Sequence, residues 1–160
     1  MSYILIGSNY NGNNFEVWVV KFESNLDMFW NSTIDSEKDN FGNSVRQLQN
    51  GNYLVCGSII DGNDSDIQLW EIPENGNPDD AIILYSEHID NSSNDYCNDA
   101  QQTNDGGYIL VGNSYSQNNA YDIRLIKLNS NGDIATENGG GFDTTYSFVN
   151  TGGYYDDKGI

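Results

Sequence analysis

The sequence predicts an all-β fold built from three copies of one antiparallel unit, and two observations lead to this prediction. A six-residue segment recurs at intervals of 50 and 55 residues, as Tyr3–Ser8, Tyr53–Ser58 and Tyr108–Asn113. Short apolar runs alternate with turns rich in Asn, Asp and Gly, and no segment shows the 3.6-residue apolar period of a helix. We therefore expect strands throughout the chain and almost no helix.

A first strand is expected ahead of the second and third copies of the recurring segment. Residues 39–52 and 94–107 align without a gap, and each ends in a turn-forming pair, Asn50-Gly51 or Asp105-Gly106. Such pairs are typical of two-residue β-hairpins, because both central positions of that turn need a positive φ. The predicted first strands, near 43–49 and 98–104, then turn back into the strand that begins with tyrosine.

A third strand follows each tyrosine-led strand and ends in a polar turn. The three aligned third strands cover residues 16–22, 66–72 and 122–128. A fourth and more variable strand is expected after each turn. Its apolar residues are Phe29-Trp30 in the first copy, Ile82–Tyr85 in the second, and a segment near Tyr146–Phe148 in the third.

The tyrosine-led and third strands are almost continuously apolar, which indicates strands covered on both faces. A four-stranded antiparallel unit of about 50 residues, covered on both sides, is typical of a β-propeller blade. We predict three four-stranded blades, over residues 1–38, 39–93 and 94–154. The first copy has no first strand of its own, and residues 155–160 start a further one, because Gly159 aligns with Gly42. Three blades are fewer than a usual ring holds, so we expect an incomplete ring or a fragment of a larger propeller.

The best-preserved copy carries a resemblance to a known family of repeats. Residues 105–112 read DGGYILVG, and residues 122–132 read DIRLIKLNSNG. This pattern resembles the propeller-type repeats of bacterial secreted and cell-surface proteins. The second copy departs from it at Glu71 and Pro73, and the first has Leu26 in place of the turn glycine. The resemblance implies a scaffold outside the cell and transfers no catalytic residue.

The sequence leaves open the structural role of the recurring glycines and of the two cysteines. Gly7, Gly57 and Gly112 recur at one strand position, either where backbones crowd together or at a simple strand end or bulge. Cys56 falls in an apolar strand slot and is predicted to be a small buried side chain. A disulfide with Cys97 stays an open alternative, and the spacing of the two cysteines fits no metal site.

Composition excludes several partners. The chain has 24 Asp and Glu against six Lys and Arg, a net charge of −18. Nucleic acid and anionic membrane surfaces both need clustered Lys and Arg, so neither is an expected partner. No apolar stretch approaches the ~20 residues of a membrane-spanning helix, so membrane insertion is not expected either.

The loops between the second and third strands are the candidate ligand-binding site. They are rich in Asn, Asp and Tyr, which can stack on and hydrogen-bond a sugar or contact a protein. The same residues also favour ordinary turns. The candidate residues are Asn11, Asn14, Asp61, Asp64, Tyr115 and Tyr121. Calcium is the one cofactor left open, because it binds oxygen-rich loops, although Asp61–Asp64 lacks the EF-hand pattern.

Three functions follow as hypotheses. The leading one is a non-catalytic binding or scaffolding β-propeller module of a secreted or cell-surface protein, with its own neighbouring blades or a second copy as partner. The first alternative is a carbohydrate-active enzyme that uses loop carboxylates. The second is a purely structural protein that forms oligomers. The lone histidine, His88, has no second histidine or reactive cysteine as a partner, and no nucleophilic triad is apparent.

Overall fold

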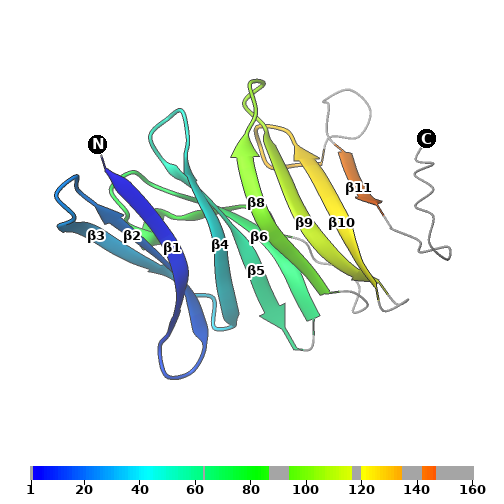
Figure 1. Ribbon diagram of the computed structural model, residues 1–160, viewed down its shortest axis with the longest axis horizontal. Helices are drawn as coiled ribbons and strands as arrows, with labels where there is room; N and C mark the ends of the chain where they lie inside the picture. Colours follow the sequence, from blue (N-terminus) through cyan, green and yellow to red (C-terminus); the bar gives the residue numbers. More distant parts are fainter. Residues whose placement is uncertain (1, 63, 87–93, 117–119, 135–141, 147–160) are drawn as a thin grey trace.

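The computed structural model describes residues 2–62, 64–86, 94–116, 120–134 and 142–146. These residues form three antiparallel sheets and one short 3-10 helix, Pro78–Asp80. The sheets follow one another in chain order along the long axis of the molecule (Figure 1). The all-β prediction is confirmed, and none of the three described sheets closes on itself. Among the described residues, no helix is long and apolar enough to cross a membrane.

The first sheet has three strands and the other two have four each, all in chain order. The first sheet contains β1 (Tyr3–Tyr10), β2 (Phe15–Phe22) and β3 (Met28–Ile34). The second contains β4 (Asp39–Gln47), β5 (Tyr53–Asp61), β6 (Asp64–Ile72) and β7 (Ile82–Ser86). The third contains β8 (Asn94–Gln102), β9 (Tyr108–Ser116), β10 (Ala120–Leu128) and β11 (Phe142–Tyr146).

The first strands, β4 and β8, begin four residues earlier than the sequence predicted. In both, the register shifts by one residue, between Gly42 and Ser44 in β4 and between Cys97 and Asp99 in β8. A bulge of this kind interrupts the pairing without ending the strand. Of the predicted later elements, Phe148 and residues 155–160 lie outside the described residues.

Each sheet has two faces, which we name by their neighbours in the chain. The leading face is turned towards the preceding sheet and the trailing face towards the following one. Side chains alternate between the two faces along a strand. In the second sheet, Tyr53 and Val55 therefore point to the leading face, and Leu54 and Cys56 to the trailing face.

Two apolar clusters hold the three sheets together. At the first junction, Val17 and Val19 of the first sheet pack against Tyr53, Val55 and further leading-face residues of the second. At the second junction, side chains from β5 and β6 pack against side chains from β9 and β10. These are Leu54, Ile67, Leu69, Tyr108, Leu110, Ile126 and Leu128. Both faces of the second sheet are thus buried, as its continuous apolar strands predicted.

The turns after the first strands differ from the predicted two-residue hairpins. Leu48 and Asn52 close a three-residue loop, and within it the Gly51 amide donates to the carbonyl of Leu48. Gly51 has φ +92° but Asn50 is not in the positive-φ region, so this is a type I turn followed by one left-handed residue. The β8–β9 turn is built in the same way around Gly106. Each of these turns therefore needs one residue with a positive φ, a glycine, whereas the prediction assumed two.

The recurring strand glycine has two different environments. A Cβ atom added at Gly57 would lie 2.0 Å from the carbonyl oxygen of Phe41, and one at Gly112 would lie 2.1 Å from that of Tyr96. In both cases the neighbouring backbone belongs to the first strand, next to its bulge. A Cβ atom at Gly7 would meet no atom within 4 Å, because the first sheet has no such strand. Backbone crowding therefore requires glycine at two of the three positions.

Candidate functional site

The predicted residues of the β1–β2 turn are largely engaged in holding that turn. The Asn11 side-chain oxygen accepts hydrogen bonds from the amides of Asn13 and Asn14, and its Nδ2 donates to Glu16 over 2.5 Å. The Asn14 Nδ2 donates to the Asp35 carboxylate and to the carbonyl of Lys38. These hydrogen bonds favour the alternative that the sequence left open, in which the Asn and Asp side chains stabilise the turn.

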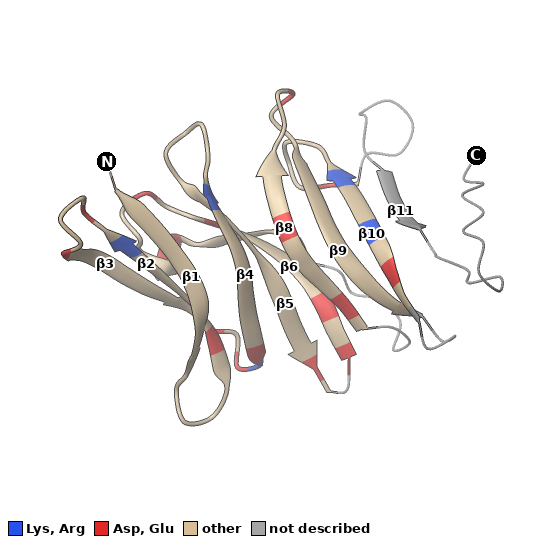
Figure 2. Ribbon diagram, in the orientation of Figure 1, with Lys and Arg blue, Asp and Glu red and all other residues tan. Residues whose placement is uncertain are grey.

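The second predicted loop is joined to the first through the connection between β3 and β4. Lys38 Nζ lies 2.5 Å from a carboxylate oxygen of Asp61, and both side chains are exposed. Asp61 and Asp64 face each other in register at the end of the β5–β6 hairpin, where Figure 2 shows acidic residues at the strand ends. The structure therefore brings Asn14 and Asp61 together around Lys38.

Hydrogen bonding also stabilises the ionised form of Asp35, the carboxylate beside Asn14. The bond from Asn14, assisted by the amide of Glu37, lowers the pKa of Asp35 below its ordinary value. Asp35 therefore stays ionised at neutral pH. A carboxylate catalyst that acts as a general acid needs a raised pKa instead, so Asp35 is poorly suited to that role.

The two predicted tyrosines form an aromatic pair on the third sheet. Tyr115 and Tyr121 are register partners, and their ring centroids lie 4.9 Å apart at an interplanar angle of 58°. Tyr121 is 65% exposed, so one ring presents a broad surface to solvent. Exposed tyrosine rings of this kind can stack on the apolar face of a sugar.

The repeat gives the tyrosine pair a structural counterpart in the first sheet. Tyr10 and Phe15 stand at the aligned positions, with ring centroids 5.2 Å apart. There the Phe15 ring also lies 5.2 Å from the ring of Phe41, on the following sheet. The tyrosine pair therefore occupies the position that, two repeats earlier, contributes to a sheet junction.

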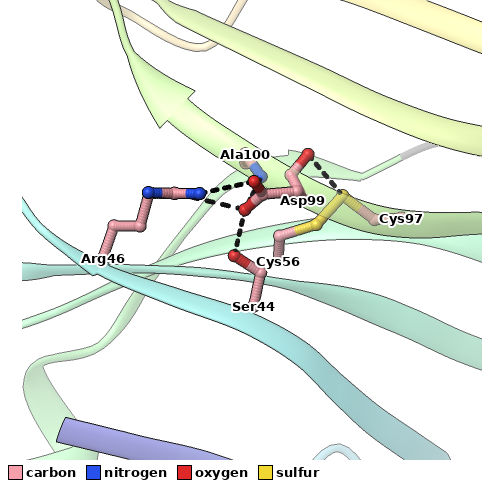
Figure 3. A network of polar contacts seen from close by, with 6 residues as sticks. All are labelled: Ser44, Arg46, Cys56, Cys97, Asp99 and Ala100. Carbon is pink, nitrogen blue, oxygen red and sulfur yellow. Dashed lines mark hydrogen bonds and ion pairs between the residues drawn. A yellow bond between two sulfur atoms is a disulfide. The ribbon is translucent and has the colours of Figure 1, made fainter.

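A polar network that the loop-based prediction missed joins β4 to β8 (Figure 3). Arg46 lies 2.5 Å from the Asp99 carboxylate, and Ser44 donates a hydrogen bond to the same carboxylate. Next to them a disulfide joins Cys56 to Cys97, with Cα atoms 5.9 Å apart. The cysteines are buried, as predicted for Cys56, and the open alternative of pairing is the one that the structure contains.

The network shifts the titration of both its charged groups. The hydrogen bond from Arg46 is the largest cause that lowers the pKa of Asp99, and the same bond raises the pKa of Arg46. Because the pKa of Asp99 is lower in the folded chain than in the unfolded one, the ionised carboxylate stabilises the folded chain at neutral pH. This stabilisation is lost as the pH falls below about 4. Both side chains are nearly half exposed, so the pair contributes at most about 1 kcal/mol.

A groove of about 460 Å³ opens beside this network, at the opposite end of the strands from the predicted loops. Polar side chains dominate its lining. It is lined by Ile4, Val45, Arg46, Gln47, Leu48, Gln49, Gln101 and Gln102. A signal was present in the sequence, since Arg46-Gln47 and Gln101-Gln102 align between the two copies.

In the part of the chain that the structure describes, no three His, Cys, Asp or Glu side chains gather in a way that could hold a metal ion. Calcium binding by the Asp61–Asp64 loop therefore stays a prediction. The chain matches no protein-family model and no curated protein. The resemblance to secreted propeller-type repeats likewise stays a prediction.

Proposed function

We propose that this chain is a non-catalytic recognition and scaffolding module of a β-propeller, in a secreted or cell-surface protein. The observation that carries this proposal is the equivalence of the two sheet junctions. Both bury the same repeat positions: Tyr53 and Val55 at the first are aligned with Tyr108 and Leu110 at the second. A chain that builds each sheet to cover the next is organised as a series of blades.

Contacts between first strands support a radial order of the blades. Asn43, the bulged residue of β4, donates to the carbonyl of Cys97 on β8 over 2.7 Å. The Arg46–Asp99 pair joins the same two strands, and the amide of Gln49, in the turn after β4, donates to the Gln102 side chain of β8. In a propeller the first strands of successive blades converge around the axis, and this role fits β4 and β8.

The disulfide supports a location outside the reducing cytosol. Disulfides persist in secreted, periplasmic and cell-surface proteins and are rare where glutathione keeps thiols reduced. Cys56–Cys97 connects two different blades in this proposal, so it would stabilise the assembly of blades rather than one of them.

The tyrosine pair is the part of the predicted site best suited to contact a ligand. Asn11, Asn14 and Asp61 already have partners within the scaffold. Tyr121, in contrast, exposes an aromatic ring beside Tyr115. We assign glycans as the first ligand class to test, because ring stacking with flanking polar groups is how sugars are commonly held.

The test is a glycan array probed with the wild-type chain and with Tyr121→Ala and Asn25→Ala. Asn25 lies in the β2–β3 turn, on another sheet, and serves as the matched exposed control. We expect binding that Tyr121→Ala reduces at least tenfold and Asn25→Ala leaves unchanged. Hydrolysis of any bound glycan, lost on Asp61→Asn, would instead favour the carbohydrate-active enzyme. Failure to bind any glycan or protein would leave a purely structural protein.

A further inference from the structure

Among the described residues, two apolar sheet faces of opposite kind are left open. The open leading face belongs to the first sheet and consists of Tyr3, Leu5, Trp18, Phe22 and Met28. The open trailing face belongs to the third sheet and consists of Ile109, Val111, Ile123 and Leu125. We propose that the open leading face of one chain docks on the open trailing face of a second copy, head to tail. This inference rests on the proposed function, in which the sheets are blades.

The open leading face has the composition of a buried one. Tyr3 and Leu5 are aligned with Tyr53 and Val55 at the first junction, and with Tyr108 and Leu110 at the second. Those four junction residues are at most 4% exposed, whereas Leu5 is 51% and Trp18 is 41% exposed. The same repeat positions are therefore covered wherever a preceding sheet is present.

The residues of the open trailing face are also aligned with residues that are buried at a junction. Val111 and Ile123 are aligned with Cys56 and Ile67, both at most 1% exposed at the second junction. On the third sheet they are 39% and 42% exposed. Their other counterparts, Ile6 and Val17, pack into the first junction.

The repeat determines which face fits which. Both junctions within the chain join a trailing face to a leading face, and neither joins two faces of the same kind. A second copy supplies the missing partner for each open face without any new type of contact. Such a contact is heterologous, so successive copies form a ring if the rotation closes and a filament if it does not.

Charge opposes this association only at long range. The chain carries a net charge of −18, whereas the nine residues named on the two open faces are uncharged. The charged side chains that share these faces, Glu16 and Lys127, are only 8% and 9% exposed. Salt screens the long-range repulsion between two acidic chains and leaves apolar burial in place. We therefore expect the association to strengthen as the salt concentration rises from 0.05 to about 0.5 M.

The experiment is analytical ultracentrifugation of the wild type, Leu5→Glu, Ile123→Glu and their equimolar mixture. Each substitution places a charge on one open face at an exposed position, so the chain should still fold, as circular dichroism will verify. We expect self-association of the wild type, and at least tenfold weaker association of either variant alone. The mixture should form a dimer, because each variant keeps the one intact face that the other lacks. The matched control is Leu26→Glu, an exposed leucine in a turn, which should associate like the wild type.

Three outcomes would overturn the proposal: a folded wild-type monomer of 17.8 kDa at all concentrations, a Leu5→Glu variant that associates like the wild type, or a mixture that stays monomeric. A folded monomer that still binds glycans through Tyr121 would refute head-to-tail docking and leave the proposed function intact. Tyr121 shares the open trailing face with Ile123, so docking would cover it in the wild type. Association of the wild type, together with no glycan binding by the Ile123→Glu variant in its monomeric form, would therefore support docking and refute the proposed function.

Discussion

The first and second junctions use the same repeat positions but fill them with different chemistry. At the first junction Ile6 lies over Gly42, where an added Cβ atom would be 2.6 Å from the Ile6 side chain. At the second, the aligned residues are Cys56 and Cys97, joined by a disulfide. The repeat thus determines which positions come into contact. The residues that make the contact, and its chemistry, differ between the two junctions.

A buried polar pair shows the same contrast. At the second junction the Arg124 guanidinium lies 3.2 Å from the Asp95 carboxylate, with side chains 8% and 0% exposed. The aligned residues at the first junction are Gln68 and Asn40, which are equally buried but uncharged. A charged pair and a neutral pair are therefore both compatible with this junction geometry.

The largest expected effect comes from breaking the buried ion pair. Arg124→Gln alone leaves the Asp95 charge buried without its main counterion, and should lower the free energy of unfolding by about 3–5 kcal/mol. Asp95→Asn with Arg124→Gln copies the residues of the first junction and should recover most of that loss. Urea unfolding of the single and double variants measures both. A double variant no more stable than the single one would mean that the junctions are not interchangeable.

Removing the disulfide should have the next largest effect. Cys56 and Cys97 are separated by 41 residues in the sequence, and closing a loop of that length contributes about 2–4 kcal/mol through the unfolded state. Cys56→Ile with Cys97→Gly, which copies Ile6 and Gly42 of the first junction, should lose about that much free energy of unfolding and keep the fold. Denaturation with and without reductant checks this, and the variant should no longer respond to reductant.

Substitutions at two positions of the recurring glycine form a matched pair, and the larger of their two effects on stability should be intermediate. Gly57→Ala places a methyl group against the Phe41 carbonyl and should destabilise the chain by about 1–3 kcal/mol. Gly7→Ala adds the same group in open space and should change stability by less than about 0.5 kcal/mol. Thermal unfolding of the two variants compares them directly. Equal effects would show that backbone crowding does not distinguish the first sheet from the second.

The smallest effect is expected in the β2–β3 turn. Leu26 has φ +69°, where the aligned turns have Gly76 and Gly132 at φ +73° and +87°. Leu26 is exposed, so Leu26→Gly loses little packing and relieves a conformation that is unfavourable for a side chain. We expect a gain of about 0.5–1 kcal/mol in the free energy of unfolding. A loss of stability would mean that the Leu26 side chain makes contacts that matter.

Sequence periodicity predicted the sheets well because each strand carries its own apolar pattern. The tyrosine-led strands and the absence of a first strand in the first copy could be seen in local residue order alone. The bulges at Asn43 and Asn98 could not, because a bulge is a feature of the pairing between two strands, which the residue order of one strand does not specify. The turns were assigned to the wrong type because Asn50-Gly51 fits both a two-residue type I′ turn and a three-residue loop in which only Gly51 has a positive φ.

The candidate site was harder to predict for a related reason. Asn14 and Asp61 meet through Lys38, a residue outside both predicted loops. The Arg46–Asp99 network depends on how two sheets stack, which residue order within one copy does not specify. The aligned pairs Ile6–Gly42 and Cys56–Cys97 were available in the sequence. Their contacts became visible only when the sheets were placed face to face.

The most direct test of junction equivalence is disulfide mapping by mass spectrometry of the chain carrying Ile6→Cys and Gly42→Cys. If the two junctions share one geometry, a bridge should form spontaneously between positions 6 and 42, beside the native Cys56–Cys97 bridge. Titration should then find no free thiol in the folded, oxidised protein. Free thiols at both new positions, or bridges exchanged with Cys56 or Cys97, would contradict the account.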